Sequence, residues 1–399
     1  MPDSIPLPQG FRTAAAHCGI KEGSTKDDLA LFVSDTPCVA AGVFTQNRVC
    51  GAPVKVSRQR VPRGTARAVI INSGNANACT GEQGDSDARW MTEEIARGLK
   101  CAADDVLVCS TGVIGRFLPR EKLAAGLPEV VSGLDAGPVK FHAAARAMMT
   151  TDTFPKQSTR ISEVAGRTVR VSGVAKGAAM IGPNMATMLS VIMTDASLDP
   201  AVADGALRSA VDDTFNCISV EGHTSTSDSV ILLANGASGT GPLNASDQAL
   251  VTKMIREVAE DLARAIIEDA EGADHVITLD VRGLRTRDEA RLIAQTIANG
   301  ALVKTAITGA DPNWGRIVSA AGYCGVDLRE NDMTLRINGT LVYESGTPTA
   351  FNAKTLSESL RRNRAVHIEL DLPLGDASIR FWTSDLTAEY VRLNSDYTT

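Results

Sequence analysis

Short apolar runs rich in β-branched residues alternate along the chain with longer segments of helical periodicity, and this alternation constrains the fold more than any other feature. The runs typical of buried strands are Ala66–Asn72, Val106–Cys109, Val169–Val174, Met188–Met193, Ser229–Leu233 and Val276–Val281. The segments typical of helices are Asp85–Lys100, Pro200–Asp213, Ser246–Ala270 and Arg287–Asn299. The sequence therefore predicts a mixed α/β protein, and its 399 residues allow two lobes or one split core.

Two of the predicted strands run into polar, glycine-containing segments. Ala66–Asn72 leads into the Gly- and Asn-rich stretch 73–81, and Val106–Cys109 leads into Ser110-Thr111-Gly112. We expect the second segment to be a loop, because glycine leaves backbone N–H groups free to point at a ligand. An ordinary turn at the end of a strand would have the same residues.

Charge and composition exclude several classes of partner. The formal net charge is -7 and only 4% of residues are aromatic, which argues against nucleic-acid binding. No apolar run is long enough to span a membrane, and residues 1–6 resemble neither a secretion signal nor a transit peptide. We therefore expect a cytoplasmic protein without a membrane partner.

Residues that would hold metals or familiar cofactors are not grouped in this sequence. The eight cysteines form no CxxC pair and are interpreted as small core residues of a reduced protein. The five histidines are scattered, and the chain contains no GxGxxG, GxxxxGK[ST], HExxH or GxSxG motif. We expect no metal and no bound cofactor.

The stretch from Lys176 to Ser190 is a flexible, turn-forming segment that runs directly into a predicted buried strand, with Thr187 at the junction. A threonine hydroxyl needs a nearby base to act as a nucleophile, and one solution is to make the residue an N-terminus whose own α-amine is that base. The α-amine has a pKa of roughly 7.7–8.0, so a useful fraction is neutral near pH 7. From spacing alone, Gly182-Pro183-Asn184 could equally be a surface turn and Thr187 an ordinary strand residue.

A series of motifs decides between these interpretations. Read from the N-terminus, they are Gly19-Ile20-Lys21, Lys26-Asp27-Asp28-Leu29-Ala30, residues 40–45, 72–81, 110–115 and 149–156, the block 176–190, Glu271-Gly272-Ala273, residues 311–316 and residues 394–399. In this order they resemble the ornithine acetyltransferase family, bifunctional glutamate N-acetyltransferase/ornithine acetyltransferases of arginine biosynthesis.

The resemblance implies self-cleavage between Ala186 and Thr187. An α chain of residues 1–186 and a β chain of residues 187–399 would stay folded together, usually as an α2β2 assembly. It also implies an α/β sandwich of two lobes with the active site between them. Thr187 would take acetyl from N-acetylornithine, release ornithine, and pass the acetyl to glutamate without coenzyme A; acetyl-CoA would be a co-substrate only of a bifunctional enzyme.

The family pattern also implies roles for other residues. Thr111 and Gly112 would form the oxyanion hole. Lys176 would pair with a substrate carboxylate and Glu271 with a substrate ammonium, although solvated surface charge is the commoner fate of both residue types. The further substrate contacts would be Thr150 or Thr151, Asn394 and Thr399.

The sequence departs from the family pattern at two places. Residues 220–228 read VEGHTSTSD where VDGDTSTND is expected, so that Glu221, His223 and Ser227 differ, and Asp274-His275 stands in place of Thr-Lys. Two alternative functions therefore stay open. One is a self-processing N-terminal-threonine aminopeptidase or amidohydrolase, in which water accepts the acyl group, and the other is a non-catalytic amino-acid-binding homologue.

Overall fold

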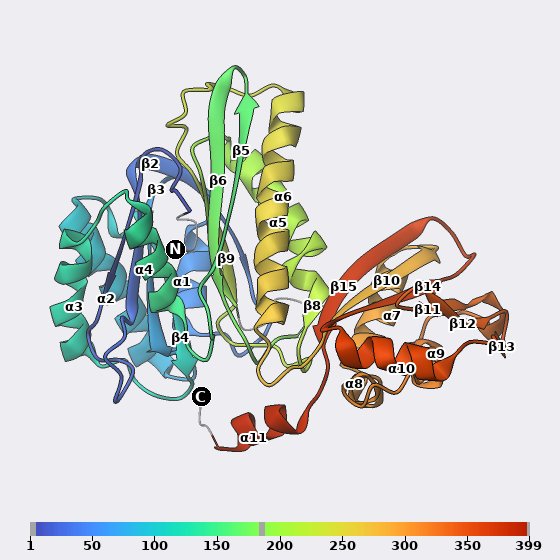
Figure 1. Ribbon diagram of the computed structural model, residues 1–399. Coiled ribbons are helices and arrows are strands. Elements are labelled where there is room, and N and C mark those ends of the chain that lie inside the picture. The colour runs from blue at the N-terminus through green and yellow to red at the C-terminus, as the bar shows by residue number, and fades with distance from the viewer. Residues whose placement is uncertain (1–4, 183–187, 397–399) are drawn as a thin grey trace.

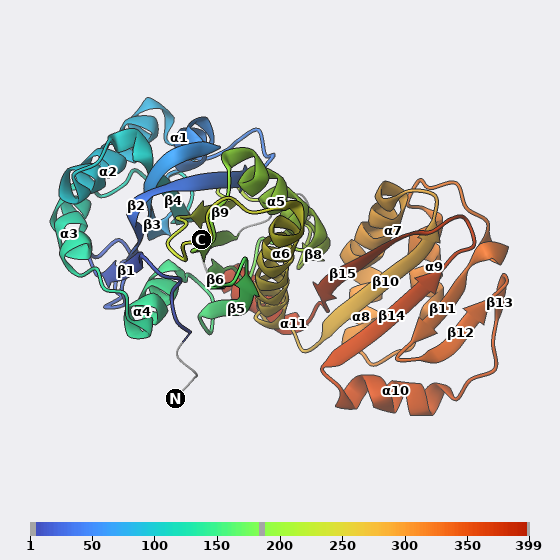
Figure 2. The same cartoon turned by 90° about the horizontal axis from the view of Figure 1, so that it is seen from above.

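Two lobes, each built on one β-sheet, make up the computed structural model, which describes residues 5–182 and 188–396 (Figures 1 and 2). The sheet of the first lobe has the strand order β4-β3-β2-β9-β7-β6-β5, and β1 pairs with β2 beside this path. Its strands are β1 (Phe11–Ala16), β2 (Leu29–Phe44), β3 (Arg63–Asn75), β4 (Val106–Val113), β5 (Lys156–Val164), β6 (Arg167–Lys176), β7 (Leu189–Thr194) and β9 (Ser229–Ala234). The pairs β3/β4 and β7/β9 are parallel, and the other pairs are antiparallel.

Helices cover both faces of this sheet. They are α1 (Ala52–Arg60), α2 (Gly81–Leu99), α3 (Arg120–Ser132), α4 (Pro138–Met148), α5 (Pro200–Asp213) and α6 (Ala245–Glu268). Alternate residues of β2 explain the layering: Leu31 belongs to the core shared with α2 and α3, whereas Phe32 belongs to the core shared with α4. Because α4 is bound in this way, the segment that follows it is held against the end of the sheet.

The second lobe contains a sheet with the order β13-β12-β11-β14-β10-β15-β8. Its strands are β8 (Ile218–Ser219), β10 (Val276–Leu284), β11 (Thr334–Ile337), β12 (Thr340–Glu344), β13 (Thr347–Pro348), β14 (Ala365–Asp371) and β15 (Ala377–Ser384). Its helices are α7 (Arg287–Asn299), α8 (Ala301–Thr308), α9 (Trp314–Gly322) and α10 (Ala353–Arg362), and α11 (Ala388–Asp396) returns beneath the first lobe (Figure 1). One apolar cluster joins α5 and α6 to this sheet, so the lobes share a core.

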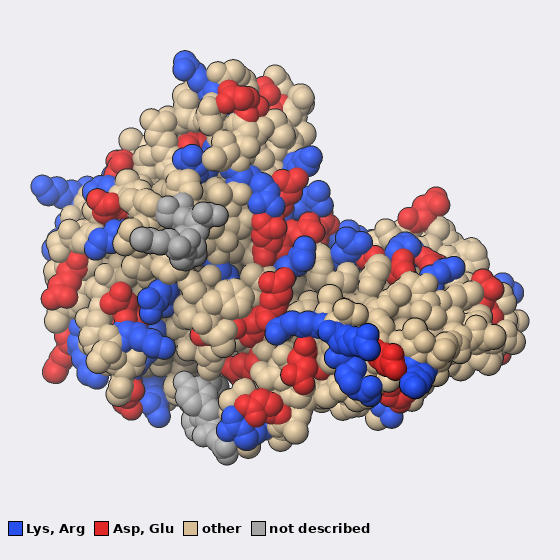
Figure 3. Space-filling model, viewed as in Figure 1, with Lys and Arg blue, Asp and Glu red and all other residues tan. Residues whose placement is uncertain are grey.

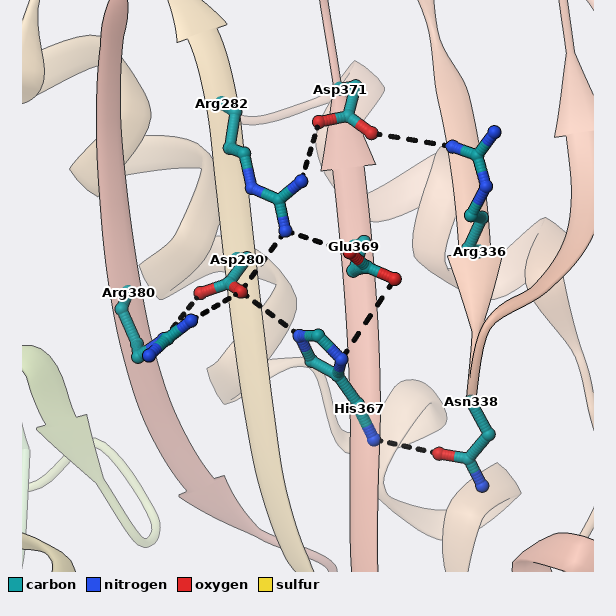
Figure 4. A network of polar contacts seen from close by, with 8 residues as sticks. All are labelled: Asp280, Arg282, Arg336, Asn338, His367, Glu369, Asp371 and Arg380. Atoms are coloured by element: carbon teal, nitrogen blue, oxygen red, sulfur yellow. Dashed lines mark hydrogen bonds and ion pairs between the residues drawn. The ribbon is translucent and has the colours of Figure 1, made fainter.

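Charged side chains line the outward face of the second sheet (Figure 4). Asp280 accepts hydrogen bonds from Arg380 at 2.7 and 2.9 Å, from Arg282 at 3.2 Å and from His367 at 3.0 Å. Burial alone would raise the pKa of Asp280, but these donors hold it well below its usual range. The network therefore neutralises a polar face opposite the helices α7–α9.

The predicted mixed α/β fold with two lobes is confirmed. Pro200–Asp213 and Arg287–Asn299 are helices with the predicted ends, and Ser246–Ala270 corresponds to α6. Asn244 caps α6 by accepting a hydrogen bond from the Asp247 N–H. Met254, Val258, Leu262 and Ile266 form an apolar stripe of this helix that packs into the core. No helix of the described ranges has both the length and the apolar character needed to cross a bilayer.

Two local predictions were wrong. Ser110-Thr111-Gly112 is not a loop, because β4 continues to Val113. These residues pair in parallel with the end of β3, which itself continues to Asn75. All eight cysteines are free thiols, but only Cys38, Cys109, Cys217 and Cys324 are buried. Cys79 is exposed and thus is not a core residue.

Candidate active site

The end of β4 is pressed against the end of β3. Gly112 has a φ of +131°, and a Cβ at this position would lie 2.3 Å from the backbone carbon of Gly74. Only glycine fits such an approach at position 112, which explains why a residue with little strand propensity stands one position before the end of β4. Thr111 is 2% exposed, and its hydroxyl points to Lys176.

Lys176, the last residue of β6, links this strand end to the segment after α4. Its Nζ donates to Thr111 Oγ1 at 3.2 Å and to Thr150 Oγ1 at 2.8 Å. Burial lowers the pKa of Lys176, and the charge of Asp152 opposes that effect. The structure thus brings together three of the predicted site residues, and of the two candidate threonines it is Thr150, not Thr151, that joins them.

A buried ion cluster supports this arrangement. Lys156 Nζ lies 2.7 Å from Asp152 Oδ1 and 2.6 Å from Asp269 Oδ2, and Asp152 also accepts the Gly177 N–H at 2.6 Å. Burial alone would raise the pKa of Asp152, but the charges of Lys176 and Lys156 and its hydrogen bonds lower it to about 2. The cluster fastens the segment containing Thr150 to the end of α6.

Ala186 and Thr187, the predicted cleavage site, lie outside the described residues. The next residue, Met188, donates its N–H to Asp228 Oδ1 at 3.0 Å. Asp228 is fully buried, and this burial raises its pKa to about 8 against the opposing effect of the Met188 hydrogen bond. A buried carboxyl group with a raised pKa therefore contacts the residue that follows the predicted nucleophile.

Glu271 and Asn394 meet at the junction between α6 and α11. Asn394 Nδ2 donates to Glu271 Oε2 at 3.2 Å, and the Glu271 N–H bonds the carbonyl of Ala178, two residues after Lys176. Gly272 lies so close to α11 that a Cβ would be 2.5 Å from the Tyr390 nitrogen. The structure therefore brings these two predicted substrate contacts together next to the segment that follows Lys176, whereas Thr399 lies outside the described residues.

A cavity of about 820 Å³ opens beside Gly112. Thr150 and Asp152 border it, and Lys21, Arg116 and Arg146 add positive charge to its lining. Across the described residues, no group of three His, Cys, Asp or Glu side chains is placed to hold a metal ion. The chemistry available is that of hydroxyls, backbone N–H groups, two buried ammonium groups and carboxylates.

Sequence reasoning missed Lys21, Asp152, Lys156, Asp228 and Asp269 as site residues. Lys156 and Asp269 are 113 positions apart, so no spacing pattern joins them. Lys21, Asp152 and Lys156 do fall within motifs noted above, and Asp228 ends the segment 220–228 compared with the family pattern, which were the signals available. The expectation that the site lies between two lobes needs refinement, because most of the described site residues belong to the first lobe and only α11 comes from beyond the second sheet.

Buried hydroxyls and charged side chains lie together beside a cavity in this two-lobed α/β fold, an arrangement typical of an enzyme active site. The chain belongs to the ArgJ family, whose model matches residues 12–399. This membership confirms the resemblance drawn from the sequence motifs.

Similar proteins match over nearly their whole length. The protein from Rhodopirellula baltica is 44% identical over 396 residues, which cover 98% of this chain and 96% of the relative. The protein from Geobacter sulfurreducens is 42% identical over 393 residues, covering 98% and 99%. Both are called arginine biosynthesis bifunctional protein ArgJ, so the prediction of an enzyme is confirmed at the level of the family.

Solved structures match parts of the chain. A Bacillus halodurans arginine biosynthesis bifunctional protein ArgJ is 38% identical with a TM-score of 0.51, and the match covers 53% of this chain and 100% of the solved one. An ornithine acetyltransferase from Mycobacterium tuberculosis, solved with ornithine, is 42% identical over 45% of this chain and 96% of its own, with a TM-score of 0.41.

Proposed function

We propose that this chain is a self-cleaving acetyltransferase that moves acetyl from N2-acetyl-L-ornithine to L-glutamate through an ester on Thr187. The observation that carries the proposal is the buried contact of Lys176 with Thr111 and Thr150, beside Gly112, which lies too close to Gly74 to carry a side chain. These residues are the ones to which the family resemblance gives substrate and oxyanion roles. Full-length similarity to curated ArgJ proteins supplies the reaction class.

In the proposed reaction, the Thr187 hydroxyl attacks the acetyl carbonyl of N-acetylornithine and its proton passes to the α-amine of Thr187. The oxyanion that forms accepts hydrogen bonds from the Thr111 hydroxyl and the Gly112 N–H. The amide C–N bond then breaks, the proton moves to the leaving nitrogen, and ornithine departs. The amine of glutamate next attacks the ester, the C–O bond breaks, and the Thr187 hydroxyl regains its proton.

Self-cleavage at Ala186/Thr187 is part of the proposal, since it creates the α-amine that serves as base. The length of the Bacillus halodurans chain supports it. That solved chain corresponds in full to 53% of this one. Residues 187–399 are 213 of 399 residues, the same share, as expected if relatives are divided at this point.

The remaining parts of the proposal concern the assembly and the second donor. The cleaved chains form a cytoplasmic α2β2 assembly that uses no bound cofactor. Because the curated relatives are called bifunctional, acetyl-CoA is proposed as a second acetyl donor to glutamate.

The experiment follows a labelled acetyl group. The protein is incubated with N-[acetyl-13C]acetylornithine and glutamate, and the products are identified by NMR. Labelled N-acetylglutamate supports the transferase, labelled acetate would instead indicate the hydrolase, and unchanged substrate with measurable binding would indicate the non-catalytic homologue. A Thr187→Ala variant is the control and should give no labelled product.

A further inference from the structure

The cavity beside Gly112 has a volume of about 820 Å³, and basic side chains lie along its lining. Its lining includes four cations, Lys21, Lys26, Arg116 and Arg146, and three carboxylates, Glu22, Asp27 and Asp152. Of these carboxylates, Asp152 is paired with Lys156 outside the lining. Arg116 lies 3.7 Å from Glu22, but Lys21, Lys26 and Arg146 have no carboxylate within ion-pair distance among residues 5–182 and 188–396. Basic side chains gather on the surface below α4 in the view of Figure 3. The cavity is therefore suited to an anionic ligand.

Lys21 is the half-buried cation of this cavity. Its Nζ donates to the carbonyls of Asp27 at 3.0 Å and Ala147 at 3.4 Å, and its stem packs on Gly74. The neighbouring carboxylate of Asp28 is occupied by the backbone N–H groups of Cys18 and Ile20. Burial lowers the pKa of Lys21 to about 8. The charge of Asp28 opposes this effect of burial. A partly desolvated ammonium whose two hydrogen-bond acceptors are carbonyls favours a ligand that brings a negative charge.

Lys21 and Lys176 lie at different faces of the end of β4. Successive strand residues point to opposite sides, so Thr111 faces Lys176 while Gly112 borders the cavity that Lys21 lines. Lys176 does not line this cavity, and its Nζ already bonds two hydroxyls. The site thus has two separate cations for anionic groups.

The two proposed amino-acid substrates share an α-carboxylate and differ at the far end of the side chain. Ornithine ends in an ammonium group and glutamate in a carboxylate. A second cation is useful only to the acceptor, because it would repel the ornithine side chain. We infer that Lys21, with Arg146 at the cavity rim, binds the distal carboxylate of the acceptor and so selects a dicarboxylic amino acid. This inference rests on the proposed function.

The test separates the two half-reactions in Lys21→Met, Lys21→Arg and Arg146→Met, with Lys253→Met on the exposed face of α6 as the matched control. The donor half-reaction is followed as acetylation of the Thr187 chain by N-acetylornithine, and the acceptor half-reaction as KM for glutamate and for glutamine. In Lys21→Met we expect the KM for glutamate to rise roughly 30-fold or more, because a desolvated charge pair is lost. The preference for glutamate over glutamine should fall by the same factor. Acetylation by N-acetylornithine should be no slower than in the wild type, because the variant removes a charge that repels the ornithine side chain.

Lys21→Arg should keep most of the preference, Arg146→Met should lose part of it, and Lys253→Met should match the wild type. An unchanged KM for glutamate would overturn the inference. Equal rises for glutamate and N-acetylornithine would assign Lys21 to the shared α-carboxylate, and a rise confined to acetyl-CoA would assign it to the phosphates of that donor. If Lys21→Met fails to fold, as judged by circular dichroism, the other two variants decide the question by the same ratio.

If the wild type is not acetylated at all, the proposed function fails and not this inference. Calorimetric binding of glutamate and glutamine to wild type, Lys21→Met and Arg146→Met then tests the carboxylate contact directly. Equal affinities of the wild type for glutamate and glutamine would contradict it.

Discussion

Lys176 is an ammonium group that the fold has removed from water, and its surroundings explain how this is tolerated. Its Nζ has two hydroxyl partners, and Asp152 supplies a compensating charge. A buried charge of this kind is stable only when hydrogen-bonded and paired. Substitution of Thr111, a direct partner of Lys176, should therefore affect activity. Substitution of Lys156, which pairs with Asp152, should mainly affect stability.

Thr111→Ala is expected to affect function. Loss of the hydroxyl removes one proposed oxyanion donor and one Lys176 partner, so kcat should fall about a hundred- to a thousand-fold. Thr111→Ser keeps the oxygen and is expected to retain most of the activity. Steady-state acetyl transfer measures both, and near-normal turnover of Thr111→Ala would refute the oxyanion assignment.

Lys156→Met is expected to affect stability. It leaves Asp152 and Asp269 buried without their shared cation, which should lower the free energy of unfolding by about 3–5 kcal/mol. Lys253→Met is a suitable control, since Lys253 is 62% exposed and its pair with Glu257 spans 3.8 Å. Exposed pairs contribute only about 0–1 kcal/mol. Urea denaturation compares the two, and a similar small loss in both would contradict the structural role.

At the level of elements, the close approach of β3 and β4 shapes the site. Gly112→Ala should both destabilise the protein and abolish most activity, because its Cβ would meet the backbone of Gly74 at 2.3 Å. Gly115 offers a matched control, with a positive φ of 79° but open space around its Cβ position. Gly115→Ala should cost only about 1–2 kcal/mol of backbone strain. Thermal unfolding and turnover distinguish them, and equal losses would mean that the close approach is unimportant.

Sequence patterns predicted the helices well and the strand ends poorly. α5 begins at Pro200 and α7 follows the cap Thr286, which are strong local signals for helix ends. The extension of β4 through Thr111 and Gly112 depends on pairing with β3, about 40 residues away, which no local propensity encodes. Lys176 and Glu271 were identified through the family resemblance. The ion cluster around Lys156 joins residues far apart in the sequence, so only the structure shows it.

For the whole molecule, buried acids make stability depend on pH in two directions. Burial raises the pKa of Asp228 to about 8 and of Glu221 to about 7, above their unfolded values near 3.9 and 4.3. The folded state therefore binds these protons more tightly, and their contribution is lost as pH rises from about 4 to 8. Asp152, with its pKa lowered to about 2, acts oppositely: its contribution is present above about pH 4 and lost toward pH 2.

We expect the melting temperature to decline between pH 5 and pH 8 and to collapse below about pH 4. Asp228→Asn and Glu221→Gln remove the titrating carboxyls, so each should flatten the decline between pH 5 and 8. Differential scanning calorimetry across this range gives the slopes. Slopes identical to that of the wild type would show that these carboxyls are not held neutral in the folded state.

The central claim is that Thr187 becomes an N-terminus and carries the acetyl group, and intact-mass analysis under denaturing conditions tests it most directly. After brief incubation with N-acetylornithine, the protein should separate into two chains divided at Ala186/Thr187, with one acetyl group on the chain that begins at Thr187. A single uncut chain of 42.0 kDa without acetyl would contradict the account.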